Sequence, residues 1–466
     1  MKKFIWLLLT ASLLSAQNII WSRIFDQGHD EFGNGIAVDG SNYIVVGGSI
    51  TSNQSDWLCI KYNSNGDTIW TKKFSTGYDD IATAVAIDQN HNIIIVGYSQ
   101  KQDSVILIIR KLNSIGNLIW TKMLRQGRRT YANGVGIDPA NNIYVVGNIE
   151  NNYDYDILLI KFNNSGDTIW TRKFSTPLDE SGEEVVVDLT NDIIVTGDIG
   201  ITGFKDVLTI KFNSNGDTLW TRYYYTGYDC YGSGVCVDNS NNVIVVGSVS
   251  QNLLTLKYDS NGNLLWTKIL NNILTTGNSC AVDTRGDIVV IGNTYIGSNY
   301  DFLLLKYTWY GDTVWSRNYN ISTYDDGNAI KIDQLANIVI TGNIFNNNDY
   351  DITTIKFNNT VGIKEYSLLK PIVDCFRLQL NSVIRKSLNF KIHLTNNQFN
   401  SRPTLLNINL YDITGYRISE IYSGQINKDE KNFSIEIPRA GLYFLLAKIQ
   451  SDNIKQIIRR KVVVLK

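Results

Sequence analysis

The sequence predicts an all-β protein: a seven-bladed β-propeller with four-stranded blades, the N-terminal strand closing the last blade, followed by a C-terminal β-sandwich. The phrase Asp-Thr-Leu-Trp-Thr-Arg at 217–222 recurs at intervals of 46 to 50 residues, a period that indicates stacked or circular repeats. The composition, with 36 Gly but 5 Pro in 466 residues and 11% aromatic residues, suits short strands joined by tight turns. The repeated tryptophans are Trp21, Trp70, Trp120, Trp170, Trp220, Trp266 and Trp315.

The N-terminus has the pattern of a secretory signal peptide, which we place at 1–16. Lys2 and Lys3 precede an apolar run that ends in small residues at Ala16. This run is too short for a stable membrane anchor, and no second apolar run reaches the length of a transmembrane segment. We therefore expect an exported protein that is secreted, or anchored at the outer cell surface by other means.

A single repeat, from Gly166 to Phe212, carries four strand patterns. Its β-branched and aromatic runs are bounded by Asn, Gly and Asp, and lie at 167–174, 184–188, 193–197 and 206–212. Four antiparallel strands in a repeat of this length form one propeller blade, whereas a β-solenoid coil uses fewer and shorter strands.

Three further series support seven blades, because each has seven members. The first short hairpin is marked by Asp39, Asp88, Asp138, Asp188, Asp238, Asp283 and Asp333. The second strand ends at Gly47, Gly97, Gly147, Gly197, Gly247, Gly292 and Gly342. The strand before each Trp strand carries Lys61, Lys111, Lys161, Lys211, Lys257, Lys306 and Lys356.

The two ends of the array complement each other. The array begins on a Trp strand at 18–25 without earlier strands of its own, and it ends on a Lys strand at 351–357 without the expected Trp strand. If the first strand completes the last blade, the ring closes and leaves no exposed sheet edge. We therefore predict that the propeller spans 17–359.

The repeat unit resembles a known family. Phrases of the form Gly-Tyr-Asp-Asp, Ala-Val-Ala-Ile-Asp, Asn-Ile-Ile-Ile-Val-Gly and Asn-Gly-Asp-Thr-Ile-Trp, in that order, are similar to the secreted bacterial β-propeller repeats of the SBBP type. The resemblance covers 17 to about 359. It implies extracellular architecture without a shared activity.

After a linker at 360–371 the rhythm changes, and alternating apolar and polar residues predict a β-sandwich at 372–466. Three phrases, at 410–418, 440–444 and 461–466, together resemble the C-terminal sorting domain of the type IX secretion system, although the usual Pro-Asn-Pro phrase is absent. The resemblance implies that this export machinery is a partner and that the domain can be exchanged for a surface anchor. An accessory sandwich without a sorting role is the alternative.

Charge and reactive residues limit the possible functions. The net charge is −12 for 17–363 and +9 for 364–466, and an acidic propeller argues against nucleic acid as a partner. The three histidines lie far apart in the sequence, so they suggest neither a catalytic triad nor a metal site. Cys236 and Cys280 occupy nearly matching places in adjacent repeats; whether they are bonded stays open, with buried thiols the favoured interpretation.

Carboxylates recur in the loop that follows each Trp strand, and we expect these loops to gather on one face of the ring. The candidate acidic rim consists of Asp30, Glu31, Asp79, Asp80, Asp179, Glu180, Asp229, Asp325 and Asp326. Such a rim is suited to calcium, to a basic peptide or to sugar hydroxyls, and an acid pair within it to glycoside cleavage. The favoured alternative is that each acid caps its own strand or loop through local hydrogen bonds.

Aromatic residues precede several Lys strands and form a second candidate site, suited to stacking on sugars. They are Trp57, Tyr153, Tyr155, Tyr300 and Tyr350. Turn formation next to Asn and Asp is the alternative explanation. The turn at 63–67 superficially resembles a calcium loop, but its length predicts a type I turn with a Gly bulge. The repeated tryptophans are assigned to packing between neighbouring outer strands.

These features favour a binding or scaffold module for an extracellular glycan or protein. No catalytic residue, metal ligand or cofactor site is assigned, although calcium at the acidic rim stays open. The alternatives are an enzyme that acts on extracellular polysaccharide through rim carboxylates, and a structural component of a surface layer.

Overall fold

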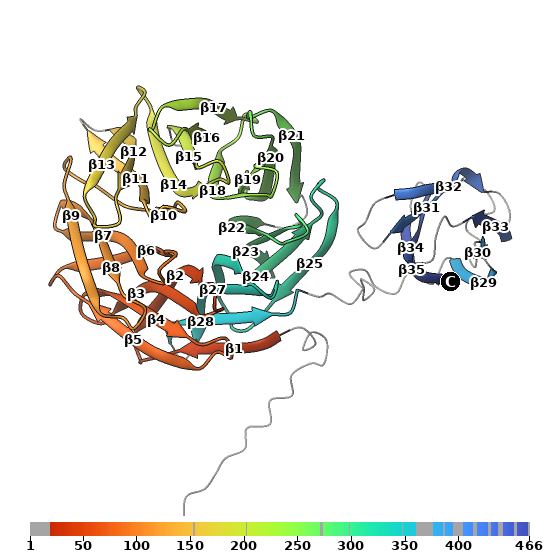
Figure 1. Cartoon of the computed structure of the whole chain (residues 1–466), viewed down its shortest axis with the longest axis horizontal. Helices are drawn as coiled ribbons and strands as arrows, with labels where there is room; N and C mark the ends of the chain where they lie inside the picture. The colour runs from red at the N-terminus through yellow and green to blue at the C-terminus, as the bar shows by residue number, and fades with distance from the viewer. Residues whose placement is uncertain are drawn as a thin grey trace, which may run out of the picture. The chain divides into compact units, whose positions relative to one another are not determined.

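The chain divides into two compact units, 1–362 and 363–466, in a computed structural model (Figure 1). The structure describes 19–359, except for 152–153, 202, 271–273, 298 and 347, and the strands of the C-terminal unit. The predicted signal peptide and linker lie outside the described residues. Within the part of the chain that the structure describes, no helix has the length and apolar character needed to cross a membrane.

Strands β1 to β28 form seven four-stranded antiparallel sheets arranged as the blades of a ring (Figure 1). This arrangement confirms the predicted seven-bladed propeller. Blades one to three are β2 (Asp30–Val38), β3 (Ile44–Thr51), β4 (Ser55–Tyr62), β5 (Thr68–Phe74); β6 (Asp79–Ile87), β7 (Ile93–Lys101), β8 (Ser104–Leu112), β9 (Leu118–Leu124); and β10 (Gly134–Ile137), β11 (Ile143–Asn151), β12 (Asp154–Phe162), β13 (Thr168–Phe174).

The remaining blades follow the same order from inner to outer strand. Blades four to six are β14 (Asp179–Val187), β15 (Ile193–Ile201), β16 (Phe204–Phe212), β17 (Thr218–Tyr224); β18 (Cys230–Val237), β19 (Val243–Val249), β20 (Asn252–Tyr258), β21 (Leu264–Leu270); and β22 (Thr275–Val282), β23 (Ile288–Ile296), β24 (Asn299–Tyr307), β25 (Thr313–Tyr319). Blade seven is β26 (Asp325–Ile332), β27 (Ile338–Asn346), β28 (Asp349–Phe357) and β1 (Ile19–Phe25).

The N-terminal strand closes the ring, as the sequence predicted. β1 pairs antiparallel with β28, with Trp21 opposite Lys356 and Phe25 opposite Ile352. Trp21 also lies in a hydrophobic cluster that contains Ile36 of the first blade. The first and last blades are therefore joined through β1.

Several of the repeated tryptophans, with the base two residues later, hold the next blade through hydrogen bonds. The Trp21 indole N–H donates to the carbonyl oxygen of Ser64 (3.1 Å), and Arg23 Nε donates to that of Gly66 (2.7 Å). These acceptors belong to the turn at 63–67 of the first blade. The indole ring therefore packs on this turn of the neighbouring blade rather than between outer strands. Gly66 has a φ of 84° and its N–H bonds to Asn63, which confirms a type I turn with a Gly bulge. The same contacts recur at Trp170 with Arg172 and at Trp220 with Arg222.

The Asp and Lys series form buried ion pairs inside the blades. Lys211 Nζ lies 2.7 Å from Asp188 Oδ2, and both side chains are buried. Lys61 and Lys161 instead donate to the carbonyl oxygens of Ser114 (2.9 Å) and Ser214 (3.1 Å) in the next blade. Both series are thus explained by packing. The other pairs are Lys111–Asp88, Lys257–Asp238, Lys306–Asp283 and Lys356–Asp333.

The glycine series needs one correction, because the member in the first blade is Gly48 and not Gly47. A Cβ on Gly48 would collide with the carbonyl oxygen of Phe32, as one on Gly97 would collide with that of Ile81. Gly47 faces only ordinary or slightly tight side-chain contacts. These glycines are required by the close approach of the inner strand, where the register shifts.

The hairpin after each inner strand places one residue at positive φ. This residue is often Asn, and its side chain accepts a backbone hydrogen bond from the preceding blade, as Asn241 does from Leu189 N–H (3.0 Å). In the seventh blade the position is held by Ala336, with a φ of 62°. Alanine gains no such bond and is disfavoured in this conformation.

We predict that Ala336→Asn stabilises the protein by about 1 kcal/mol, because Asn tolerates the left-handed conformation and regains an acceptor for the preceding blade. Urea unfolding measures the change, and Asn241→Ala serves as the matched opposite. A lower stability for Ala336→Asn would contradict the role assigned to this position.

A disulfide joins the inner strands of the fifth and sixth blades. Cys236 in β18 and Cys280 in β22 are bonded, with their Cα atoms 6.0 Å apart. The favoured interpretation of these residues as unpaired thiols is therefore wrong. Adjacent inner strands lie close enough to bring the two side chains together, which a one-residue offset between repeats obscured. Cys59 and Cys230 are buried free thiols.

The C-terminal unit contains two antiparallel sheets, ordered β29-β30-β33 and β32-β31-β34-β35. The register of the larger sheet places Tyr411 opposite Phe444, and Phe444 opposite Lys461. The three phrases that carry the sorting-domain resemblance thus lie in adjacent strands. The strands are β29 (Phe376–Ile384), β30 (Ser387–Leu394), β31 (Thr404–Asp412), β32 (Arg417–Ile426), β33 (Glu430–Glu436), β34 (Gly441–Ser451) and β35 (Ile454–Val464).

Candidate functional site

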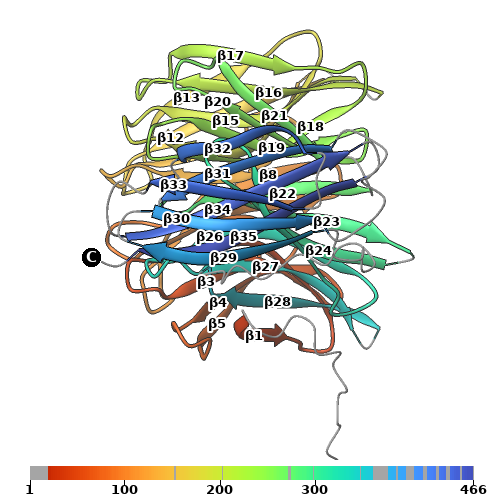
Figure 2. The same ribbon diagram turned by 90° about the vertical axis from the view of Figure 1, so that its right-hand side faces the viewer.

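Two sets of loops meet on one face of the ring, which we call the loop face. One set joins an outer strand to the inner strand of the next blade, as at 75–78, and the other joins second and third strands, as at 52–54. Asp79 Oδ1, at the end of the first loop, accepts a hydrogen bond from the N–H of Ser55, at the end of the second (3.2 Å). The hairpin turns occupy the opposite face, and the two faces are visible when the ring is viewed from its edge (Figure 2).

At four rim positions the first acid caps the backbone of the preceding blade. Asp179 accepts from Tyr155 N–H (3.1 Å), and Asp229 from Lys205 N–H (2.8 Å). Asp30 does the same for Tyr350 across the closing junction (3.1 Å). Together with Asp79, these acids therefore hold neighbouring blades together.

The next position along the inner strand is buried, and its acid accepts from its own loop in three blades. By register Asp325 holds this position, although it is the first acid of its own pair. Asp80 accepts from the N–H (2.5 Å) and the hydroxyl (2.7 Å) of Thr76, and Glu180 accepts from the corresponding groups of Thr176. Asp325 accepts in the same way from the loop residues 321 and 322. Burial raises the pKa of Glu180 and of Asp325, with these hydrogen bonds opposing the shift.

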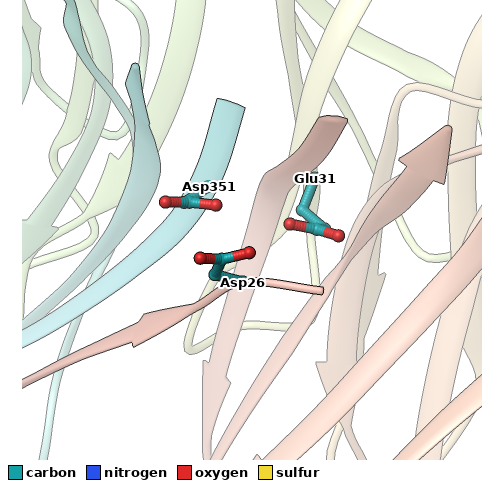
Figure 3. A group of neighbouring side chains, drawn as sticks. All are labelled: Asp26, Glu31 and Asp351. Atoms are coloured by element: carbon teal, nitrogen blue, oxygen red, sulfur yellow. The ribbon is translucent and has the colours of Figure 1, made fainter. Parts of the chain in front are cut away.

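Glu31 departs from this pattern. It is fully buried, and neither of its carboxylate oxygens has a hydrogen-bond partner among the described residues. It faces Asp26, which follows β1, and Asp351 of β28 (Figure 3). Asp326, the last predicted rim acid, pairs with the side-chain amide of Asn293. Among the rim carboxylates Glu31 therefore has the weakest local anchoring: the backbone of Gln27 lowers its pKa, but no close, well-aligned hydrogen bond reaches it from the described residues.

The structure places the predicted aromatic residues in different environments. Trp57 is 1% exposed and packs in the hydrophobic cluster between the first and second blades. It therefore offers no surface for stacking on a sugar, contrary to the prediction. Tyr153 lies outside the described residues. Tyr300 and Tyr350 are brought together through Tyr324, with ring centroids 5.0 and 5.7 Å from it.

Tyr155 lies apart from that group. Its ring centroid is 6.4 Å from that of Tyr131, which in turn contacts Tyr98 (5.0 Å). These rings line the second and third blades on the loop face. The three rings are partly buried. None of them therefore presents a fully open face on which a sugar could stack.

The sequence interpretation missed the most exposed aromatic group, which we call the aromatic patch. Phe204 is 75% exposed and Tyr225 is 74% exposed, on the loop face of the fourth and fifth blades. Phe204 and Tyr223 line one shallow depression together with Leu178 and Asp206. A signal was present, because Tyr223 stands where the first and third repeats have Lys. We define the patch as the residues that share the depression and the exposed tyrosines that follow β17 or lie in β18: Leu178, Phe204, Tyr223, Tyr225, Tyr228 and Tyr231.

One charged residue on an inner strand also went unnoticed. Glu184 of β14 accepts a hydrogen bond from Val235 N–H in the fifth blade (2.7 Å). Burial raises its pKa, and the charge of Lys331 in the seventh blade opposes this shift. Glu184 therefore ties the fourth and fifth blades together.

Comparison with known proteins agrees with this architecture. Residues 119–154 match the family model described as SBBP, a beta-propeller repeat. No curated protein matches the chain in sequence.

Solved structures resemble the propeller at low identity. The polysaccharide lyase Uly1 has a TM-score of 0.50 and 8% identity, over 73% of this chain and 99% of that one. Sqt1 from Chaetomium thermophilum has a TM-score of 0.46 and 10% identity, over 73% and 98%. The β-propeller domain of the Trilobed protease from Pyrococcus furiosus has 0.45 and 9%, over 70% and 97%. At these identities the likeness concerns the fold alone. The chain is a seven-bladed β-propeller that contains an SBBP-type repeat.

Proposed function

We propose that the protein is an extracellular binding module whose propeller recognises a glycan through the aromatic patch. The observation that carries the proposal is the exposure of Phe204 and Tyr225 on neighbouring loops of one face. Large apolar side chains grouped on a surface mark interaction sites, since leaving them in water is unfavourable. Binding, rather than catalysis, is the activity that we assign.

The chemistry of the patch favours sugars. Aromatic rings offer flat apolar faces that cover the C–H face of a pyranose, and tyrosine adds a hydroxyl for hydrogen bonding. Asp206 lines the same depression as Tyr223, and Lys205 Nζ lies 5.6 Å from the ring centre of Tyr231. Flat apolar faces bordered by a few polar groups characterise a ligand site more than a dry protein interface.

Export is part of the same proposal. The signal-like pattern at 1–16 and the phrases at 410–418, 440–444 and 461–466 support delivery to the cell exterior through the type IX machinery. The adjacent pairing of Tyr411, Phe444 and Lys461 is consistent with these phrases forming one feature. A glycan-binding ring would then be presented where extracellular polysaccharides occur.

The full chain should bind a subset of glycans on a broad array, and the double variant Phe204→Ala/Tyr225→Ala should weaken that binding at least about tenfold. Loss of two stacking rings removes the contacts that orient the sugar. Isothermal titration calorimetry with the best glycan measures the change.

The matched control is Trp309→Ala, which removes an exposed aromatic on a turn of the opposite face. It should bind as the unmodified chain does. Unchanged glycan binding by the patch variant would contradict the site. Failure to bind any glycan, combined with capture of a protein ligand that the patch variant loses, would replace the glycan by a protein.

A further inference from the structure

Corresponding positions recur wherever two blades meet on the loop face. At the junction of the third and fourth blades they are Asp156 in the third strand, Lys173 and Ser175 after the tryptophan, and Glu180 in the next inner strand. Lys173 Nζ lies 3.1 Å from Asp156 Oδ2, so it neutralises one of the two acids. The junction of the first and second blades repeats the set as Asp56, Lys73, Ser75 and Asp80, with 3.9 Å between Lys73 and Asp56.

The closing junction, between the seventh and first blades, has the opposite charge balance. Its corresponding residues are Asp351, Ile24, Asp26 and Glu31. Isoleucine takes the place of the lysine, and a third carboxylate takes the place of the serine. Oxygen atoms of Asp26, Glu31 and Asp351 lie within 4.8 Å of one another. The three side chains converge from β1, β2 and β28 (Figure 3).

Two of these carboxylates are buried and between them leave three oxygens without a well-aligned hydrogen bond from the described residues. Glu31 and Asp351 are each 0% exposed. Both oxygens of Glu31, and Oδ1 of Asp351, have no hydrogen-bond partner among the described residues, while Asp351 Oδ2 accepts from the Asn346 amide (2.9 Å). Leaving buried carboxylate oxygens without a partner costs free energy that an ion would recover.

The electrostatics agree with this geometry. Burial raises the pKa of Glu31 to about 7, the backbone of Gln27 offsets part of this shift, and the charges of Asp351 and Asp26 add to it. Asp349 contributes a further negative charge nearby. Asp26 is exposed, so the group of three acids borders solvent on that side.

We propose that Asp26, Glu31 and Asp351 bind a calcium ion that fastens the closing junction of the propeller. Three carboxylates without nitrogen or sulfur ligands form a hard, all-oxygen set of the kind that calcium takes, with water completing the shell. The ion supplies the positive charge that Lys73 and Lys173 supply at other junctions. Because its ligands come from the N-terminal strand segment, the last blade and the first blade, the ion fixes the closure of the ring. This inference is independent of the glycan proposal.

Thermal unfolding and calorimetry of the full chain test the site. After treatment with EDTA, addition of 1 mM calcium should raise the unfolding midpoint by about 5 °C or more, and calorimetry should give one site. Magnesium should act more weakly, because it demands tighter octahedral geometry. Asp26→Asn and Glu31→Gln should each remove most of the shift.

The decisive variant is Ile24→Lys/Asp26→Ser, which gives the closing junction the residues found at the junction after the third blade. It should fold, melt in EDTA at or above the midpoint of the EDTA-treated parent, and no longer respond to calcium. Asp103→Asn, which changes an exposed acid on the loop face, should keep the full response. No shift and no calorimetric heat for the parent chain would overturn the proposal, as would an undiminished response in the double variant.

Discussion

Deleting residues 18–25 is expected to lower the midpoint of thermal unfolding by at least about 10 °C. β1 supplies the outer strand of the seventh blade, and its Trp21 lies in the core shared with the first blade. Removing a packed aromatic of this size costs ~3–5 kcal/mol, and the deletion also exposes the edge of β28. A loss of this size is a large part of the ~5–15 kcal/mol that stabilises typical domains. Circular dichroism in EDTA measures the effect apart from any bound cation.

Two point variants separate the contributions of this strand. Trp21→Ala should reproduce much of the loss, whereas Ile20→Ala, at a half-exposed position of the same strand, should change stability by less than about 0.5 kcal/mol. A synthetic peptide of residues 18–25 should partly restore the deletion variant, because the open edge of β28 can accept an added strand. An unchanged midpoint after the deletion would show that the ring does not depend on β1.

The fold was predictable because its signal is repeated. A tryptophan, an aspartate, a glycine and a lysine each recur seven times at similar offsets, and a repeated error in interpretation is improbable. The complementary ends of the array also determined the closure by β1, since a ring with an open blade leaves backbone groups unpaired. Local offsets were less certain: Gly47 and Gly48 are adjacent, and only the register with β2 distinguishes them.

The candidate site was less predictable, because a sequence names side chains but not the direction in which they point. Asp79 and Asp80 were treated alike, yet consecutive residues of a strand face opposite sides, so one caps a neighbouring blade and the other is buried. Trp57 follows the same rule and points into the core. Phe204 begins β16 and Tyr225 follows β17, so their placement depends on where these two paired strands start and end.

The grouping of Asp26, Glu31 and Asp351 could not be predicted from the sequence alone. Asp26 and Asp351 are separated by nearly the whole propeller, and Glu31 belonged to a series of similar acids. Their difference is visible only when each junction is compared with the others in space. In that comparison Ile24 stands where Lys73 and Lys173 stand at two other junctions, and Asp26 adds a third carboxylate to the closing junction.

Replacing Lys211 by methionine is expected to destabilise the protein by about 3–5 kcal/mol, because it leaves a buried carboxylate without its counter-charge. Lys211 Nζ lies 2.7 Å from Asp188 and 3.1 Å from Asp192, and it is buried together with Asp188. The double variant Lys211→Met/Asp188→Asn should lose much less, since Asn keeps the acceptor that holds the hairpin turn at Thr190 and Asp192. Urea unfolding at neutral pH measures both. Equal losses for the single and double variants would show that the charge itself is unimportant.

The pH dependence of the same pair provides an independent check. Burial alone would raise the pKa of Asp188, but the hydrogen bonds from Lys211, Thr190 and Asp192 together outweigh burial and lower the pKa. Burial alone would lower the pKa of Lys211, but its hydrogen bonds to Asp188 and Asp192 outweigh burial and raise the pKa. The stability that Asp188 contributes is therefore present above its unfolded pKa of about 3.9, and it is lost as the pH falls through the folded pKa. The stability that Lys211 contributes is present below its unfolded pKa of about 10.4, and it is lost as the pH rises through the folded pKa. The stability difference between the unmodified chain and the double variant should be greatest between these limits and shrink in acid, because protonated Asp188 no longer needs the ammonium. A difference that stayed constant down to about pH 3 would mean that packing of the lysine stem, rather than its charge, holds the blade together.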